Sequence, residues 1–243
     1  MMLNRLSTGG RIDRSKPLKF KFNGKTYTGF SGDTLASALI ANGVSLTARS
    51  FKYHRPRGIV GAGVEEPSTL VELLGDDASG NRPATTVPLT EGLAARSVNC
   101  WPSPNFDLGG LTQVATHFLP AGFYYKTFKW PNWHVFEPTI RKAAGLAAAP
   151  SCPPTTGHFE NRYAHTDLLV AGAGPAGLMA ALTAARAGKR VMLVDEGIEP
   201  GGSLLSTSQS IGSLPALDWV AEVVGELGEN PNVTHMQNAT VWG

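Results

Sequence analysis

The sequence is poor in cysteine and in charge, and both shortages exclude functions. Its two cysteines, Cys100 and Cys152, are too few for a disulfide scaffold or for the four thiolates of an iron–sulfur cluster. Charged residues make up 16% of the 243 residues, and the formal net charge is only +2. This balance gives no electrostatic reason to expect nucleic acid or an acidic membrane as a partner.

The chain also lacks a targeting signal and a membrane span. Residues 1–16 carry three arginines without the apolar stretch that a secretory signal needs. Residues 168–185 are apolar, but the glycines and proline near their start favour a buried strand, a tight turn and a helix. We therefore expect a cytoplasmic protein that stays out of the membrane.

Composition divides the chain into several regions. Hydrophobic residues reach 42%, enough for a core, while 28 glycines and 17 prolines predict short elements with many turns. We expect an N-terminal tail over residues 1–16 and a small domain over residues 17–98. A connector rich in aromatic residues and proline follows over residues 99–163. A nucleotide-binding domain then begins at residue 164 and runs to residue 243.

The first domain begins with a hairpin pattern. Residues 18–22 alternate between apolar and polar, and Asn23 and Gly24 then separate them from a second short run. Asn-Gly in this position is a strong hairpin signal because both residues tolerate positive φ. Asp33 is positioned to cap the helix that follows, and Gly43 to end it. A hairpin followed by a helix predicts an α+β roll, and a β-grasp fold in particular.

The connector shows little regular pattern. It concentrates tryptophan, phenylalanine and tyrosine among prolines, and it ends in a turn-rich boundary at residues 147–156. Such aromatic side chains pack either onto neighbouring domains or against another subunit or a flat cofactor. The pattern does not separate these alternatives.

The most specific pattern begins after residue 166. An apolar strand at residues 167–171 runs into Gly-x-Gly-x-x-Gly, then into an alanine-rich helix and a second apolar strand. Gly172 permits the tight turn, Gly174 lets a pyrophosphate approach the backbone, and Gly177 lets the helix sit close on the strand. The phosphates would lie against the free amides at the start of the helix. The alternative is a turn that binds nothing.

Acidic residues follow the second strand. Asp195 is placed to accept hydrogen bonds from the ribose hydroxyls, and Glu196 is the alternative acceptor. Neither position is an arginine, so nothing there would bind the 2′-phosphate of NADP. We therefore prefer NAD, although FAD uses the same geometry. A glycine pair further along resembles a loop that covers the dinucleotide in flavoprotein reductases. The candidate binding residues are Gly172, Ala173, Gly174, Pro175, Ala176, Gly177, Asp195, Glu196, Gly202 and Ser203.

The nucleotide-binding domain is incomplete at its C-terminus. A Rossmann-like α/β domain needs more strands than follow the helix expected at residues 214–227. The sequence therefore predicts the N-terminal part of a longer protein.

Other chemistries find no support in the residues. No pair of the six histidines has zinc-site spacing beside a carboxylate, and no nucleophile elbow or Walker loop occurs. Cys100 has no activating neighbour in sequence, so we expect an inert thiol. We assign no catalytic residue and no metal ligand.

The order of these features resembles the α subunits of heterotetrameric sarcosine oxidases. The residues that carry the resemblance are the connector sequences at 121–128 and 137–145, together with the fingerprint at 167–177. The first domain is similar to a [2Fe–2S] ferredoxin-like domain. It has no cysteine in the glycine-rich loop at residues 57–67, so the cluster is excluded.

The resemblance implies a flavin-dependent enzyme that oxidatively demethylates sarcosine to glycine with O₂. The products would be H₂O₂ and formaldehyde, or methylenetetrahydrofolate when tetrahydrofolate is present. It further implies NAD on this chain, FAD and FMN on or with the β subunit, and γ and δ subunits as further partners. Sarcosine and tetrahydrofolate would bind outside this chain, which alone would be inactive.

Two alternatives remain open at this point. The chain could bind FAD as one component of a related dehydrogenase acting on proline, hydroxyproline or an opine. It could instead be a non-catalytic scaffold whose bound nucleotide only stabilises the fold. The loop without cysteine argues against the first alternative, since such relatives tend to keep the cluster.

Overall fold

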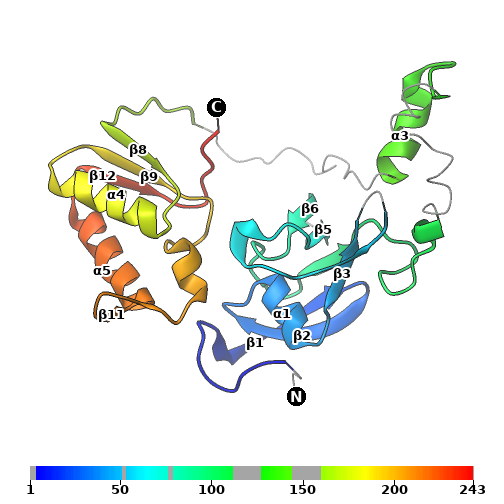
Figure 1. Cartoon of the computed structure of the whole chain (residues 1–243), viewed down its shortest axis with the longest axis horizontal. Helices are drawn as coiled ribbons and strands as arrows, with labels where there is room; N and C mark the ends of the chain where they lie inside the picture. Colours follow the sequence, from blue (N-terminus) through cyan, green and yellow to red (C-terminus); the bar gives the residue numbers. More distant parts are fainter. Residues whose placement is uncertain (1–3, 51–52, 76–78, 112–126, 144–159, 243) are drawn as a thin grey trace. The chain divides into compact units, whose positions relative to one another are not determined.

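The chain forms two units, each with its own hydrophobic core (Figure 1). The computed structural model describes residues 4–50, 53–75, 79–111, 127–143 and 160–242. The boundary between the units falls between Thr155 and Thr156. Within these described ranges, no helix is both long enough and apolar enough to span a bilayer.

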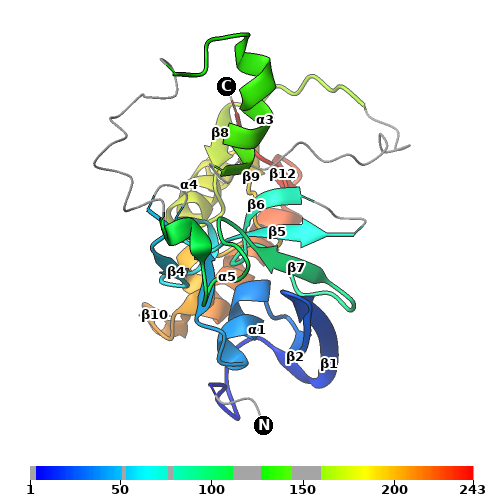
Figure 2. The same ribbon diagram turned by 90° about the vertical axis from the view of Figure 1, so that its right-hand side faces the viewer.

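The first unit is built on a five-stranded mixed sheet in the order β2-β1-β7-β5-β6 (Figure 2). β1 pairs antiparallel with β2 and parallel with β7, while β5 runs antiparallel to both β6 and β7. The strands are β1 (Asp13–Phe22), β2 (Lys25–Ser31), β5 (Leu70–Leu74), β6 (Ser79–Pro83) and β7 (Ala94–Ser97). A mixed sheet crossed by one helix is the α+β roll expected from the sequence.

The hairpin between β1 and β2 turns at the predicted residues. Asn23 and Gly24 have φ angles of 50° and 77°, and Phe22 faces Lys25 across the turn. The first strand, however, already begins at Asp13, within the segment expected to be a tail. It passes Pro17 through a shift in register, so the proline interrupts the pairing without ending the strand.

Helix α1 (Leu35–Ala41) is capped by Thr34, and the expectation that Asp33 would cap it was wrong. The Thr34 hydroxyl accepts a hydrogen bond from the Ser37 amide at 3.2 Å. The Asp33 carboxylate instead accepts hydrogen bonds from the Arg5 guanidinium, the Phe30 amide and the Ser37 hydroxyl. Gly43 follows the helix with φ of 77°, as predicted for the residue that ends it.

The core of the first unit lies between α1 and the sheet. Its largest fully buried side chains are Phe20 and Phe22 of β1, Leu35 and Leu39 of α1, and Val71 of β5. The shorter elements of this unit are β3 (Leu46–Arg49), β4 (Pro56–Gly58) and the 3₁₀ turn η1 (Gly63–Glu65).

The connector contains a helix that its sequence did not predict. Helix α3 (Trp133–Ala143) includes Pro138 in its interior, which is why the sequence favoured an irregular segment. The rings of Phe128 and Phe136 lie 5.0 Å apart, so the helix packs locally. Residues 112–126 and 144–159 lie outside the described part, as do most of the 121–128 sequence and the boundary at 147–156.

The second unit is a three-stranded parallel sheet in the order β12-β9-β8, with helices α4 and α5 packed on it (Figure 1). The elements that form it are β8 (Leu168–Ala171), α4 (Pro175–Arg186), β9 (Val191–Val194), α5 (Ala216–Glu229) and β12 (Val233–Met236). Between β9 and α5 lie η3 (Gly202–Ser206), β10 (Ser210–Ile211) and β11 (Leu214–Pro215). This is the predicted succession of strand, helix and strand.

We expect Leu39→Ala to destabilise the first unit by about 2–5 kcal/mol, because it leaves a cavity at a fully buried position. Ile40→Ala on the same helix is the matched control, since Ile40 is 40% exposed. Its cost should stay within about 1 kcal/mol. Urea unfolding of the whole chain measures both, and equal losses would contradict the assignment of the core.

Candidate dinucleotide-binding site

The candidate site is built on the turn between β8 and α4. Gly172 follows the last residue of β8 with φ of 100°, a conformation that favours glycine. Its amide donates to the carbonyl of Val194 at 2.7 Å, at the carboxyl end of β9. The turn is therefore fixed at the edge of the sheet where the parallel strands end, which is where open α/β sheets bind ligands.

The start of helix α4 offers unpaired amides. Gly174 is its N-cap and Pro175 its first residue, and no side chain caps the helix. The first hydrogen bond of the helical ladder is donated by Leu178 to Gly174 at 2.9 Å, so the amides of Ala176 and Gly177 have no acceptor within the helix. These amides and the positive end of the helix dipole favour an anion.

Two glycines of the turn, Gly177 and Gly174, differ in the space around them. A Cβ on Gly177 would lie 1.9 Å from the carbonyl oxygen of Gly172, so only glycine allows the helix to pack this closely on the turn. A Cβ on Gly174 would meet no heavy atom within 4 Å. The space in front of Gly174 is therefore open, as an approaching pyrophosphate requires.

Asp195 faces the turn from the end of β9. One carboxylate oxygen accepts a hydrogen bond from the Ala173 amide at 2.6 Å, and the other accepts from the Gly197 amide at 2.7 Å. Each oxygen keeps a further lone pair, so the carboxylate can still accept hydrogen bonds from a ligand. A Cβ on Gly197 would lie 2.7 Å from Asp195 Oδ1. The sequence reasoning missed Gly197, for which only its place two residues after the acid gave a signal.

The glycine pair of the following loop also reaches the turn. The Gly201 amide donates to the Ala173 carbonyl at 2.7 Å. A Cβ on Gly202 would lie 2.9 Å from the Cα atom of Gly174. Both glycines have positive φ, 126° and 53°. The loop thus lies against the backbone that would carry the phosphates.

The structure brings most of the candidate residues together. Gly172, Ala173, Gly174, Gly177, Asp195 and Gly202 meet around the turn, and Pro175 and Ala176 begin the helix beside it. Glu196 and Ser203 are exposed, and within the described ranges their side chains make no hydrogen bond. Ligand binding by these ten residues stays a prediction.

An ion pair stabilises the opposite end of the same strands. Asp167, just before β8, accepts a hydrogen bond from the Arg190 guanidinium at 2.8 Å. Arg190 lowers the pKa of Asp167 to about 2. Because Asp167 and Arg190 precede the two strands, their ion pair lies away from the glycine turn. The charged side chains that follow β9 near the turn are Asp195 and Glu196.

The first unit contains a histidine–carboxylate pair with no reactive nucleophile. His54 Nδ1 and Asp107 Oδ2 are 2.7 Å apart, and Asp107 also accepts from the amides of Trp101 and Gly109. Burial, together with the charge of Asp107, raises the pKa of the Cys100 thiol to about 11. This thiol stays protonated at neutral pH, in agreement with the inert thiol expected from the sequence.

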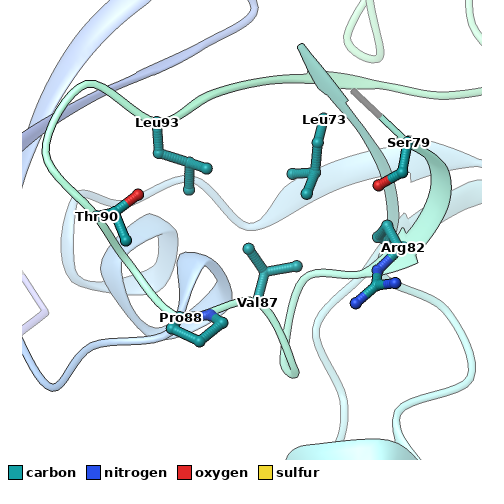
Figure 3. A pocket seen from close by; sticks show the side chains of 7 residues that line it. All are labelled: Leu73, Ser79, Arg82, Val87, Pro88, Thr90 and Leu93. Atoms are coloured by element: carbon teal, nitrogen blue, oxygen red, sulfur yellow. The ribbon is translucent and has the colours of Figure 1, made fainter. Parts of the chain in front are cut away.

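A hollow of about 330 Å³ lies on the first unit (Figure 3). Leu73, Val87 and Leu93 point into it, and Arg82 lies at its side. The lining holds no acid–base pair, so it offers no catalytic arrangement. Elsewhere in the described ranges, no cluster of histidine, cysteine, aspartate or glutamate could hold a metal ion.

Two family models match the two units. A family described as 2Fe-2S iron-sulfur cluster binding domain matches residues 15–100. A family described as FAD dependent oxidoreductase matches residues 167–229, which include the glycine turn, α4 and Asp195.

Sarcosine oxidase α subunits are similar to almost the whole chain, as the sequence led us to expect. The one from Rhizobium meliloti (strain 1021) is 53% identical over 98% of this chain, and the one from Corynebacterium sp. (strain U-96) is 35% identical over 98%. The chain spans 24% and 20% of their lengths. One component of the opine oxidase of Rhizobium meliloti is 35% identical over 31% of this chain and 15% of its own length.

One solved structure shares the fold at low sequence identity. L-proline dehydrogenase from P. horikoshii aligns with a TM-score of 0.54 and 17% identity, over 93% of this chain and 34% of its own. At this identity the similarity shows the fold alone.

We expect Gly177→Ala to destabilise the second unit by about 3 kcal/mol, because the new methyl group collides with the Gly172 carbonyl oxygen. Gly174→Ala is the control, since its methyl group enters open space and costs at most about 1 kcal/mol at a helix N-cap. Urea unfolding measured on both variants checks this difference. Equal stabilities would contradict the close packing of α4 on the turn.

Proposed function

We propose that this chain is the NAD-binding and interface portion of the α subunit of a sarcosine oxidase-type enzyme. The observation that supports this most strongly is the 53% identity to such a protein over 98% of the chain. The glycine turn supports the nucleotide, since it combines unpaired amides, open space and a carboxylate at the end of the second strand.

Each part of the turn has a proposed role in holding the dinucleotide. The amides of Ala176 and Gly177 would bind the pyrophosphate, which approaches past Gly174. Asp195 would accept hydrogen bonds from the ribose hydroxyls, with Glu196 beside it, and Gly202 and Ser203 would cover the bound molecule. A 2′-phosphate would meet carboxylates at positions 195 and 196, which favours NAD over NADP.

The proposed reaction takes place in the complete complex. It oxidatively demethylates sarcosine to glycine with O₂ and yields H₂O₂ and formaldehyde, or methylenetetrahydrofolate with tetrahydrofolate. FAD and FMN would be held on or with the β subunit, and the γ and δ subunits would complete the complex. No residue of this chain is proposed to be catalytic, so the chain alone would be inactive.

A second candidate is FAD at the same turn. It is favoured by the match of residues 167–229 to FAD dependent oxidoreductases. Both dinucleotides present a pyrophosphate and an adenosine ribose, so the geometry of the turn accepts either. In this case the chain would itself carry the redox cofactor, as the flavin-binding part of a related amine or amino-acid dehydrogenase.

The test uses the complete α polypeptide, co-expressed and purified with its partner subunits. We expect denaturation to release NAD, identified by chromatography, and Gly174→Val to reduce the NAD content by at least about tenfold, because the side chain blocks the pyrophosphate. Gly225→Val is the matched control. It adds the same side chain in open space on α5 and should leave the NAD content unchanged.

The same preparation distinguishes the candidates. If Gly174→Val reduces the FAD content and not the NAD content, the turn binds FAD and the second candidate is correct. An unchanged nucleotide content would mean that the pyrophosphate binds elsewhere. A complex without flavin absorbance that releases no peroxide with sarcosine would contradict the proposed activity, whichever nucleotide the turn holds.

A further inference from the structure

The first unit matches an iron–sulfur domain, yet its residues do not fit a cluster. Biological [2Fe–2S] clusters are held by cysteine thiolates, in some cases with histidines replacing two of them. Residues 15–100 hold one cysteine, Cys100, and one histidine, His54, which pairs with Asp107. The glycine-rich loop from Gly58 to Thr69 holds neither residue type. The donor set therefore excludes the cluster that the family description implies.

A buried carboxylate occupies the centre of this loop. Glu66 is only 3% exposed. Its Oε2 accepts hydrogen bonds from the amides of Val60 at 2.7 Å and Gly61 at 2.5 Å, and its Oε1 accepts from the Ser68 amide at 2.7 Å. The loop is thus wrapped around one negative charge.

Gly61, Glu66 and Thr69 lie at the sequence spacing of cluster ligands. Plant-type ferredoxins bind their cluster through Cys-x₄-Cys-x₂-Cys and a more distant cysteine. Here four residues separate Gly61 from Glu66, and two separate Glu66 from Thr69, whose hydroxyl donates to the Gly58 carbonyl at 3.2 Å. Ala84, which is fully buried, donates its amide to the Thr69 carbonyl at 2.8 Å and holds this end of the loop in place.

We propose that the carboxylate of Glu66 replaces the iron–sulfur cluster of the family as the internal anion that organises this loop. A cluster carries negative charge, and its sulfurs accept hydrogen bonds that tune it. Glu66 supplies a negative charge and accepts three backbone hydrogen bonds from the same loop, without iron and without redox chemistry. The proposal does not depend on which dinucleotide the second unit binds.

The electrostatics of Glu66 agree with this role. Among the described residues no basic side chain pairs with it, and the amides of Val60, Gly61 and Ser68 compensate for its burial. Burial raises the pKa of Glu66, but the hydrogen bonds donated by the backbone of Gly61, Val60 and Ser68 lower it, and the net pKa lies below the ordinary 4.5. The carboxylate is therefore ionised at neutral pH.

The other ionisable residues on the elements around Glu66 are either exposed or paired with each other. Arg57 of β4, Glu65 of η1 and Arg82 of β6 are exposed. Glu72 of β5 pairs with Arg96 of β7. The amides of Val60, Gly61 and Ser68 donate to Glu66 directly, so a titration of these three amides at acid pH reports on its carboxylate.

The first experiment compares Glu66→Gln with Glu65→Gln in the whole chain. Glutamine keeps the shape of the side chain but removes its charge. Its NH₂ group would also face at least one backbone amide that now donates to a carboxylate oxygen. We expect Glu66→Gln to lower the folding equilibrium constant of the first unit by at least about tenfold, and to speed hydrogen exchange at the amides of Val60, Gly61 and Ser68. The exposed Glu65→Gln should change neither by more than about twofold. Equal effects of the two variants would overturn the proposal.

A second measurement needs no variant, so it remains decisive if Glu66→Gln fails to fold. We expect the NMR shifts of the Val60, Gly61 and Ser68 amides in the natural chain to titrate together, with a midpoint below pH 4.5. The stabilisation by Glu66 is complete above pH 4.5 and is lost as the pH falls through this midpoint. Amides that do not titrate together would overturn the proposal, as would cluster absorbance after incubation of the chain with iron and sulfide.

Discussion

The hydrogen bond between the Ala173 amide and the Asp195 carboxylate is the contact on which the candidate site depends. It ties the glycine turn after β8 to the end of β9, and the Gly201 amide adds a second tie through the Ala173 carbonyl. With its centre fixed in this way, the turn leaves the first amides of α4 unpaired and the space before Gly174 open. That contact also sets the distance between the Asp195 carboxylate and the first amides of α4, the two groups proposed to bind the ribose and the phosphates.

The first unit uses carboxylates in the same way. Asp33 accepts from the Phe30 amide beside α1, Asp107 accepts from the amides of Trp101 and Gly109, and Glu66 accepts from three amides of its loop. Backbone donors that are removed from water need an acceptor, and an ionised carboxylate forms stronger hydrogen bonds than a neutral group. A chain with little charge thus uses several of its acidic residues to close loops.

The sequence predicted features that local rules determine. Asn23 and Gly24 identified the hairpin because their positive φ angles are a property of the turn alone, and the glycine spacing placed the turn before α4. What it missed depends on tertiary contacts. Thr34 caps α1, whereas the Asp33 carboxylate binds Arg5, which is distant in sequence, and Gly197 matters only because it approaches Asp195. The loop pattern showed that a cluster was excluded, but not that Glu66 fills its place.

The two units show that a chain can match a family in its fold without having the residues for that family's cofactor. The first unit keeps the fold of an iron–sulfur domain, yet its donor set has none of the thiolates through which a cluster would relay electrons. The second unit matches a FAD dependent oxidoreductase family, and the groups proposed to hold a dinucleotide there are amides and glycines and not reactive side chains. A binding site made of backbone depends on its glycines, whereas a cluster site depends on its cysteines. This difference supports the proposal that this chain holds a nucleotide and not a cluster.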